Sequence, residues 1–269
     1  MQIRALSKNV IDIEKKRDPS SVMLGGLPIA RYSMDEAASN IVEHALRVRG
    51  RNLRPLFSTS ANGQVLAMCL RQPELLDLMH KADHIHADGM PLVKFSRFWS
   101  PEPLPERVST TDLVHAVAAK AQAAGASFYF LGATEEVNAK AVDAMQQAYP
   151  QLKIVGRRNG YFTRNEEERI VADIRRKRPD ILWVGLGFPL EQQFIVRNLD
   201  RLRGVGVVKT SGGLFDFLSG SVRRAPEWMQ RSGLEWAYRA YQEPRRLALR
   251  YLITNPLAVY ALWSRSPLR

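Results

Sequence analysis

The sequence is poor in the features that would assign a class at once. It contains one cysteine, Cys69, in 269 residues, which excludes an intrachain disulfide and a cysteine-rich zinc site. A lone cysteine is typical of a reducing, cytoplasmic compartment. No apolar run reaches the roughly 18 residues of a transmembrane helix, since Tyr251–Trp263 is short and contains Asn255-Pro256. The N-terminal residues also lack the apolar stretch of a signal peptide.

Acidic residues are scarce relative to basic ones. The chain has 39 Lys and Arg against 27 Asp and Glu, a net charge of +12. Half of this excess lies in residues 221–269, which contain nine arginines, three glutamates and no lysine or aspartate. Such a segment indicates an anionic partner, either nucleic acid, an acidic membrane surface or phosphates. The hydrophobic content of 45% and charged content of 25% otherwise exclude a chain that is disordered throughout.

Apolar runs of strand length alternate with helical periods after Gly25. Helices are expected between the strands, including 135–148 and 166–177, the second capped by Asn165. This alternation predicts an α/β fold with a mostly parallel sheet covered by helices on both faces. Composition changes near Gly220, so we expect an N-terminal arm over 1–24, a core over 25–220 and a helical appendage over 221–269. The expected strands are 55–59, 84–87, 127–131, 153–156, 180–186 and 206–209.

Four predicted strand ends carry residues suited to chemistry, and ligands of such sheets bind where strands end. Asp88 is placed as a general base would be, or it caps the next helix. Ser60 and Asn62 can bind ligand hydroxyls, but capping a helix is the simpler interpretation of both. Gly132-Ala133-Thr134 and Gly187-Phe188-Pro189 can let backbone amides approach a phosphate, or merely form turns.

Metal-binding patterns are weak. His84 and His86 share one face of an expected strand, but no third ligand can be identified, so we expect ordinary packing. The sequence has no Asp-x-Asp, the usual carboxylate pair for a metal-bound nucleotide sugar. No Ser-His-Asp or Cys-His set is evident either. We therefore predict no metal site and no cofactor.

The C-terminal segment interleaves arginine with aromatic residues. Between Leu234 and Tyr251 apolar positions recur every three or four residues, which is typical of an amphipathic helix. Composition alone favours helices packed on their own domain with arginines in water. The second interpretation is a helix lying in a membrane interface, where each basic residue contributes about 1 kcal/mol on an anionic surface. The third is a nucleic-acid surface with bases stacked on the aromatic rings.

Several short motifs occur in a characteristic order along the chain. The first half contains Ala87-Asp88-Gly89, Arg107-Val108 and Asp112. The second half contains the most specific ones: Phe215-Asp216-Phe217, Gly220, Arg224-Ala225-Pro226-Glu227-Trp228, Gly233-Leu234-Glu235-Trp236 and Glu243-Pro244-Arg245-Arg246. Taken together, these motifs resemble the WecG/TagA/CpsF family, glycosyltransferase family 26, over residues 25 to 251. The resemblance implies a Rossmann-like catalytic core and a C-terminal appendage that docks on the membrane.

The same resemblance implies an inverting, metal-independent transferase in bacterial exopolysaccharide or cell-surface glycan synthesis. It would move a hexose from a UDP-sugar to a polyprenyl-diphosphate-linked sugar. UDP-glucose, UDP-N-acetylmannosamine and its uronic acid all remain candidate donors. The protein would be cytoplasmic and peripheral on the inner face of the cell membrane, without nucleic acid as a partner. The apolar face of the appendage also allows a homo-oligomer.

Residue roles follow from the matching positions. Asp88 corresponds to the proposed general base, and Ser60, Asn62 and Arg107 complete the expected catalytic set. The residues expected to bind the donor are Asp112, Gly132, Thr134, Gly187, Glu191 and Gln192. Those expected to bind the acceptor or the membrane are Arg224, Arg239, Arg245, Arg246 and Arg250.

The chain departs from the family pattern near the expected donor pocket. Ser60 replaces a threonine and Thr110 a common glycine. The family's Gly-x-Pro-Lys-Gln-Glu is here Gly187-Phe188-Pro189-Leu190-Glu191-Gln192. These differences leave the donor open. Two other hypotheses remain, a basic nucleic-acid-binding protein and a scaffold that keeps the fold without catalysis.

Overall fold

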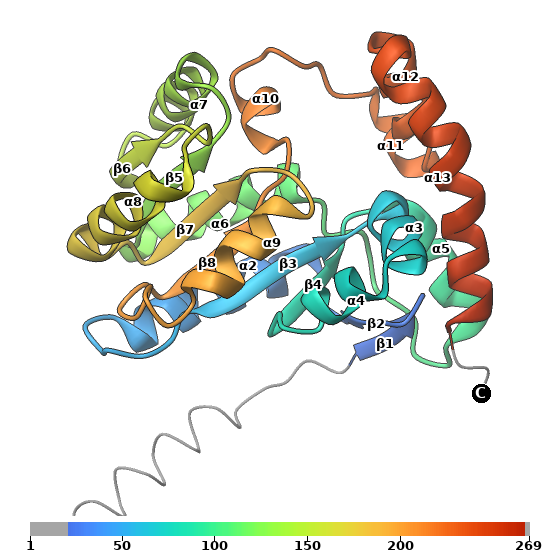
Figure 1. The fold of residues 1–269 in the computed structure, drawn as a ribbon, viewed down its shortest axis with the longest axis horizontal. Helices are drawn as coiled ribbons and strands as arrows, with labels where there is room; N and C mark the ends of the chain where they lie inside the picture. The colour runs from blue at the N-terminus through green and yellow to red at the C-terminus, as the bar shows by residue number, and fades with distance from the viewer. Residues whose placement is uncertain (1–20, 267–269) are drawn as a thin grey trace, which may run out of the picture.

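Six parallel strands form the centre of the molecule, in a computed structural model that describes residues 21–266 (Figure 1). Every pairing in this sheet is parallel, in the order β4-β3-β8-β7-β5-β6. The carboxyl ends of all six strands therefore meet at one edge, as the predicted α/β class requires. The strands are β3 (Leu56–Ala61), β4 (His84–Ala87), β5 (Ser127–Gly132), β6 (Lys153–Arg158), β7 (Ile181–Gly185) and β8 (Val207–Thr210).

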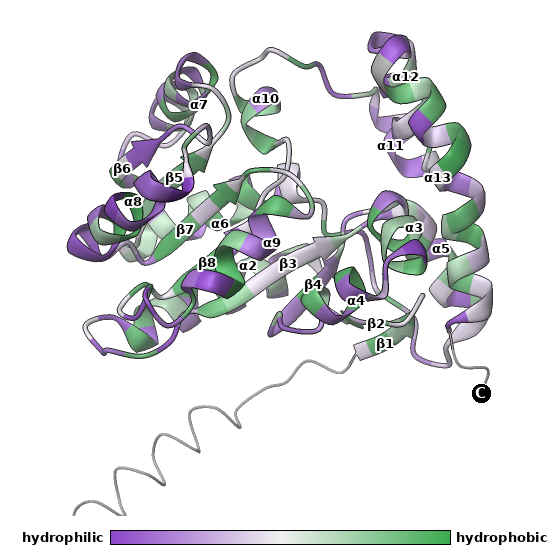
Figure 2. Cartoon of the chain, in the orientation of Figure 1, coloured by the Kyte–Doolittle hydropathy of each residue, from purple (hydrophilic) through white to green (hydrophobic). Residues whose placement is uncertain are grey.

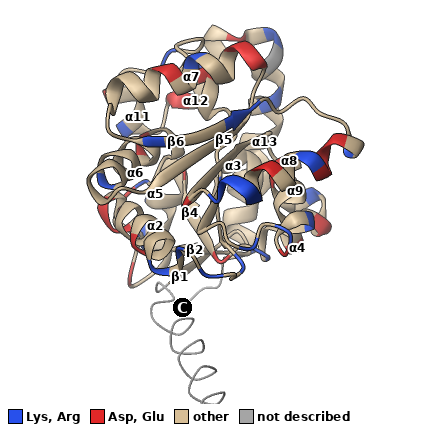
Figure 3. Cartoon of the chain, turned by 90° about the vertical axis from the view of Figure 1, so that its left-hand side faces the viewer, with Lys and Arg blue, Asp and Glu red and all other residues tan. Residues whose placement is uncertain are grey.

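Helices cover both faces of the sheet because alternate strand residues point to opposite sides. Phe128 and Phe130 of β5 pack on one face, and Tyr129 and Leu131 pack on the other. The first face carries α2 (Met34–Val48), α6 (Thr110–Ala124), α7 (Glu135–Ala148) and α10 (Leu214–Leu218). The second face carries α8 (Arg164–Lys177) and α9 (Leu190–Asn198). Acidic and basic side chains occur along α8, on the outside of the fold (Figure 3).

A third hydrophobic cluster lies beside the β4 edge of the sheet. An antiparallel hairpin of β1 (Ser21–Leu24) and β2 (Leu27–Ala30) contributes Leu24 and Leu27 to this cluster. Strand β1 thus includes four of the residues that we assigned to an N-terminal arm, and the rest of that arm lies outside the described residues. The surrounding helices are α3 (Gly63–Arg71), α4 (Pro73–Met79) and α5 (Met90–Trp99).

The predicted strands agree with the observed ones to within two residues at each end. The predicted cap of α8 is wrong, because the helix begins at Arg164 and its N-cap is Thr163 rather than Asn165. Thr163 and Glu166 form a capping box, in which the Thr163 amide donates to Glu166 Oε2 at 2.8 Å. This reciprocal pairing satisfies free amides of the first turn, so the helix starts two residues earlier than expected.

The appendage consists of α11 (Glu227–Ser232), α12 (Glu235–Gln242) and α13 (Pro244–Ser264). The single amphipathic period expected from 234 to 251 spans two helices, because Pro244 disfavours helix at the residue before it and starts a new one. Helix α13 continues through Pro256 and packs against α3 (Figure 1). Its end joins the hairpin, where the Gly26 amide donates to the Arg265 carbonyl at 2.9 Å. Within residues 21–266, no helix is both long and apolar enough to span a membrane.

Asp180, immediately before β7, ties the amino ends of the strands together. Its carboxylate accepts from Arg49 Nε and from the amide and hydroxyl of Ser127, each at 2.7 Å. Burial opposes ionisation of Asp180, but these bonds outweigh it and lower the pKa. The resulting stabilisation is present above the ordinary carboxyl pKa and is lost as the pH falls through the lowered value.

We predict that Asp180→Ala lowers the free energy of unfolding by about 3 kcal/mol, since buried donors lose their acceptor. Urea unfolding followed by circular dichroism at pH 7 measures this change. Asp143→Ala, at an exposed site on α7, is the control and should change stability little. Equal stability of the two variants would contradict the prediction.

Candidate active site

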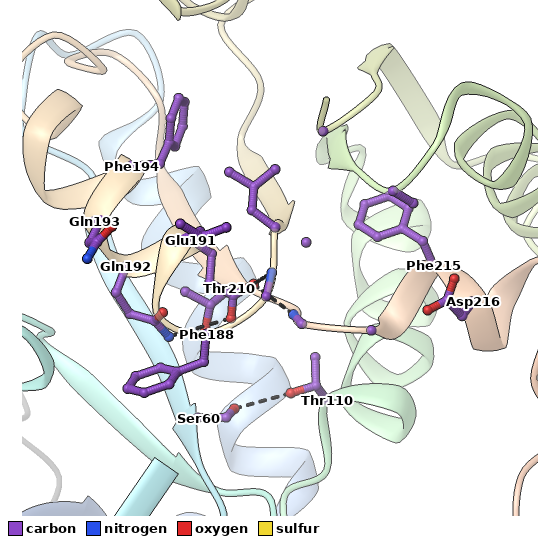
Figure 4. A pocket seen from close by; sticks show the side chains of 18 of the residues that line it. Ser60, Thr110, Phe188, Glu191, Gln192, Gln193, Phe194, Thr210, Phe215 and Asp216 are labelled. Carbon is purple, nitrogen blue, oxygen red and sulfur yellow. Dashed lines mark hydrogen bonds between the residues drawn. The ribbon is translucent and has the colours of Figure 1, made fainter. Parts of the chain in front are cut away.

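A cavity of about 1100 Å³ opens at the carboxyl edge of the sheet. Residues that follow β3, β4, β5, β7 and β8 line it, and Arg239 and Arg250 of the appendage complete it. Figure 4 shows part of this lining, with Ser60 and Thr110 on one side and Phe215 and Asp216 on another. The volume lies just above the roughly 300–1,000 Å³ that is typical of small-molecule sites, so the cavity is large enough for a sizeable ligand.

Asp88 lies half-buried in this cavity, directly after β4. Its amide donates to the Ala61 carbonyl at 2.9 Å, and the Thr110 amide at the start of α6 donates to Asp88 Oδ1 at 3.2 Å. Burial raises the pKa of Asp88, against the opposing charges of Arg107 and Lys209. Asp88 does not cap the helix that follows it, because the N-cap of α5 is Gly89 with no side-chain bond, but its bond to Thr110 satisfies the first amide of α6, as the helix-capping interpretation predicts. A cavity carboxyl with a raised pKa is suited to accept a proton.

Ser60 and Asn62, at the end of β3, also line the cavity. The Ser60 hydroxyl lies 3.2 Å from the Thr110 hydroxyl (Figure 4). Asn62 caps α3, because its side-chain oxygen accepts from the Val65 amide at 3.2 Å. The capping interpretation is therefore confirmed for Asn62, and its predicted contact with substrate stays a prediction.

Glu191 joins two glycine loops at the cavity wall. Its Oε2 accepts from the Gly212 amide at 2.9 Å and from the Gly187 amide at 3.2 Å. Burial raises the pKa of Glu191 to about 7. The adjacent Gln192 donates to Thr59 Oγ1 at 3.1 Å. Glu191 thus fixes the two loops and Gln192 bonds to the sheet, and both residues also line the cavity.

Lys209 is a polar residue of the site that the sequence analysis missed. Its side chain is fully buried in β8, and Nζ donates to Ser60 Oγ at 2.8 Å and to the Thr210 carbonyl at 2.9 Å. Burial lowers the pKa of Lys209 to about 8, while Asp88 and Glu191 act in the opposite direction. Lysine is rarely fully buried unless an acidic group pairs with it. Because Lys209 lies in the short apolar strand Val207–Thr210, the sequence could have indicated a buried acidic partner.

Two arginines of the appendage line the cavity. Arg239 lies over the Phe217 ring, and Arg250 lies over the Tyr251 ring. The Nε atom of each is buried and has no hydrogen-bond partner among the described residues. Both side chains are half-buried: Arg239 Nη2 lies 3.7 Å from Glu243 Oε1, and Arg250 Nη2 donates to the Tyr251 hydroxyl at 3.3 Å. Guanidinium groups that line a cavity are suited to an anionic ligand.

Three other predicted site residues form an ion network outside the cavity lining. Arg107 donates to Glu235 at 2.8 Å and lies 3.5 Å from Asp112. Arg224 donates to Asp112 at 2.7 Å and to Glu235 at 3.2 Å. Arg107 and Arg224 also bond the Gln230 side chain. The network fastens α11 and α12 to the core near α6, whereas the substrate contacts predicted for Arg107, Asp112 and Arg224 stay predictions.

The remaining predicted residues have mixed positions. Thr134 and Gly187 line the cavity, whereas Gly132 and Arg245 do not. The Arg246 side chain lies outside the described residues. His84 and His86 are buried beside Tyr32, and His86 Nε2 lies 3.1 Å from Ser58 Oγ, which agrees with ordinary packing. Among residues 21–266, no group of three His, Cys, Asp or Glu side chains is placed to hold a metal ion.

Comparison with known proteins matches the chain to one family. The family model described as "Glycosyl transferase WecG/TagA/CpsF family" matches residues 22–269. A Bacillus spizizenii protein is 30% identical over 214 residues, covering 79% of this chain and 81% of its own. A Staphylococcus aureus protein is 28% identical over 250 residues, covering 93% and 95%. Both are named N-acetylglucosaminyldiphosphoundecaprenol N-acetyl-beta-D-mannosaminyltransferase.

We predict that Glu235→Gln loosens the appendage, because Arg107 and Arg224 both lose a charged partner. Limited trypsin digestion should then cleave after Arg223 or Arg224 several times faster, since the segment before α11 opens more often. Glu227→Gln is the matched control, because that exposed glutamate pairs with Arg231 within α11. Equal cleavage rates in the two variants would show that the network does not hold the appendage.

Proposed function

The chain belongs to the WecG/TagA/CpsF glycosyltransferase family, and we propose that it transfers a hexose from a UDP-sugar to a polyprenyl-diphosphate-linked sugar with inversion. The names of its relatives support this substrate pair, since they specify an N-acetylmannosaminyl group and an N-acetylglucosaminyl-diphosphoundecaprenol acceptor. UDP-N-acetylmannosamine and UDP-glucose are the two donors that we propose to test first.

The observation that carries the proposal is the Asp88 carboxyl with its raised pKa, in a cavity of about 1100 Å³ at the carboxyl edge of the sheet. In the proposed reaction, Asp88 takes the proton of the acceptor hydroxyl while that oxygen bonds to the anomeric carbon. The bond from that carbon to the UDP oxygen breaks on the opposite side, and one displacement inverts the configuration. General-base catalysis of this kind typically contributes about 10²–10⁴-fold to the rate.

Negative charge in this reaction lies on two diphosphates. We propose that Arg239 and Arg250 bind the acceptor diphosphate, because both line the cavity from the appendage and a guanidinium group can donate two hydrogen bonds to a phosphate. The departing UDP would lie at the opposite wall, near Thr134 and the amino end of α7. Amides at a helix start stabilise phosphate charge.

The appendage also supports action at a membrane surface. Helix α13 carries exposed apolar side chains. Its apolar positions are the green segments of the helix in Figure 2. Such side chains and neighbouring arginines are typical of an interfacial helix. We propose a peripheral position on the cytoplasmic face, where a lipid-linked acceptor is within reach. The exposed residues are Leu249, Leu252, Ile253, Val259, Tyr260 and Trp263.

A turnover assay tests the proposal. The protein is mixed with each UDP-sugar and with short polyprenyl diphosphates carrying glucose or N-acetylglucosamine, in the presence of a chelator. Release of UDP together with a lipid-linked disaccharide supports the function and identifies the donor. Absence of turnover with every pair, with and without lipid vesicles and divalent cations, would overturn it.

We predict that Asp88→Asn lowers kcat at least a hundredfold, since the amide cannot accept the proton. UDP affinity, measured by calorimetry, should stay within about threefold because Asp88 is assigned to the acceptor. Asp143→Asn on α7 is the surface control. Near-normal turnover by Asp88→Asn would exclude Asp88 as the base.

We predict that Arg239→Met and Arg250→Met each raise the acceptor KM at least tenfold, because one charge-assisted diphosphate contact is worth roughly 1.5–3 kcal/mol. The KM for the UDP-sugar should change much less. Arg231→Met, an exposed arginine of α11, is the matched control. A rise in the KM for the UDP-sugar alone would contradict the prediction, because the arginines would then bind the diphosphate of the donor.

A further inference from the structure

The side-chain ammonium of Lys209 is buried near the carboxyl end of the central strand β8, beneath residues that line the cavity. Strand β8 lies between β3 and β7, and Lys209 is paired with Ser58 on one side and Trp183 on the other. Its side chain has no exposed surface. A buried ammonium is costly unless its donors and charge are matched, so the residues around it are constrained.

A chain of hydrogen bonds connects Lys209 to the position of Asp88. Nζ donates to Ser60 Oγ at 2.8 Å, and Ser60 Oγ lies 3.2 Å from Thr110 Oγ1. The amide of the same Thr110 donates to Asp88 Oδ1 at 3.2 Å. Ser60, Thr110 and Asp88 all line the cavity, whereas Lys209 does not. Lys209 therefore acts on the cavity through other residues.

Charges from five surrounding segments face this region. Asp88 after β4 and Glu191 of α9 favour the charged form of Lys209. Burial, and after it the Lys209 ammonium, keeps the pKa of His86 in β4 well below its usual value, which favours the neutral imidazole. Arg107 before α6 and Glu235 of α12 act on Asp88 with opposite signs. Besides Arg107, Lys209 is the cation that favours ionised Asp88.

We propose that Lys209 is a positioning residue, which orients the Ser60 and Thr110 hydroxyls and keeps Asp88 in the carboxylate form that accepts a proton. Lys209 neither gains nor loses a proton in the reaction and does not touch substrate. The catalytic consequence rests on the proposed function, whereas the effect on Asp88 does not. Removal of the positive charge favours the neutral acid, so Asp88 would ionise only at higher pH.

The main test compares wild type with Lys209→Met and Lys209→Gln in two measurements. The glutamine variant keeps a donor toward Ser60 but loses the charge, so it separates the two roles. The first measurement is the titration of the Asp88 carboxyl by carbon NMR without substrate, assigned with Asp88→Asn. Both variants should titrate about one pH unit higher than wild type. An unchanged Asp88 titration in either folded variant would overturn the inference, whatever the enzyme activity.

The second measurement is the pH dependence of kcat/KM. The acid limb should move up by the same amount, giving about a tenfold loss at pH values below the wild-type limb and little loss above the limb of the variants. A loss of equal size at every pH would indicate packing alone and contradict the proposal.

Two further variants complete the design. Ser60→Ala removes the hydroxyl link but keeps the charge, so kcat should fall without movement of the acid limb. Lys177→Met removes a lysine that lies over Tyr129, away from the cavity lining, and should change neither measurement. A shift of the Asp88 titration in the lysine variants without turnover in wild type would support the inference and reject the proposed function.

Discussion

One buried positive charge constrains the polar residues at the carboxyl edge of the sheet. Lys209 lies on a central strand without exposed surface, so its ammonium has to find its partners inside the protein. Ser60 from β3, Asp88 after β4 and Glu191 from α9 supply a hydroxyl and two carboxyl groups around it. These three residues also line the cavity, so the groups that stabilise the buried ammonium belong to the candidate site. Glu191 also accepts hydrogen bonds from the Gly187 and Gly212 amides, and so it holds these two loops beside the cavity.

The appendage completes the cavity because it is attached to the core at both ends. Near the start of α12, Arg107 of the core donates to Glu235 and Gln230, and Asp112 of α6 accepts from Arg224 of the appendage. At the other end of α13, the Arg265 carbonyl and the Ser266 hydroxyl accept from the hairpin turn at Gly26 and Gly25. Arg239 and Arg250 are held between these attachments, facing the cavity. The apolar residues of α13 remain exposed, so the same helix is available to a membrane surface and to the proposed acceptor diphosphate.

Periodicity predicted most of the fold, because buried parallel strands are continuous apolar runs and their ends fall at glycine and short polar residues. Asp88, Ser60 and Asn62 were located by the same rule. This rule does not distinguish arginines that form ion pairs from arginines that line the cavity. Spacing along the chain does not show whether a cation pairs with Asp112 and Glu235 or faces a cavity. Lys209 was hidden by its apolar neighbours in β8. The start of α8 was misplaced because Thr163 and Asn165 are both good caps, and only the reciprocal contact with Glu166 selects the first.

The central claim is that Asp88 faces the acceptor hydroxyl while the UDP-sugar lies at the opposite wall of the cavity. A crystal structure with a non-hydrolysable UDP-sugar and a short polyprenyl-diphosphate acceptor tests it most directly. The account predicts the acceptor hydroxyl at about 3 Å from the Asp88 carboxyl, with its diphosphate at Arg239 and Arg250. An acceptor hydroxyl bound instead to Asp216 or Glu191, with Asp88 away from both substrates, would contradict the account.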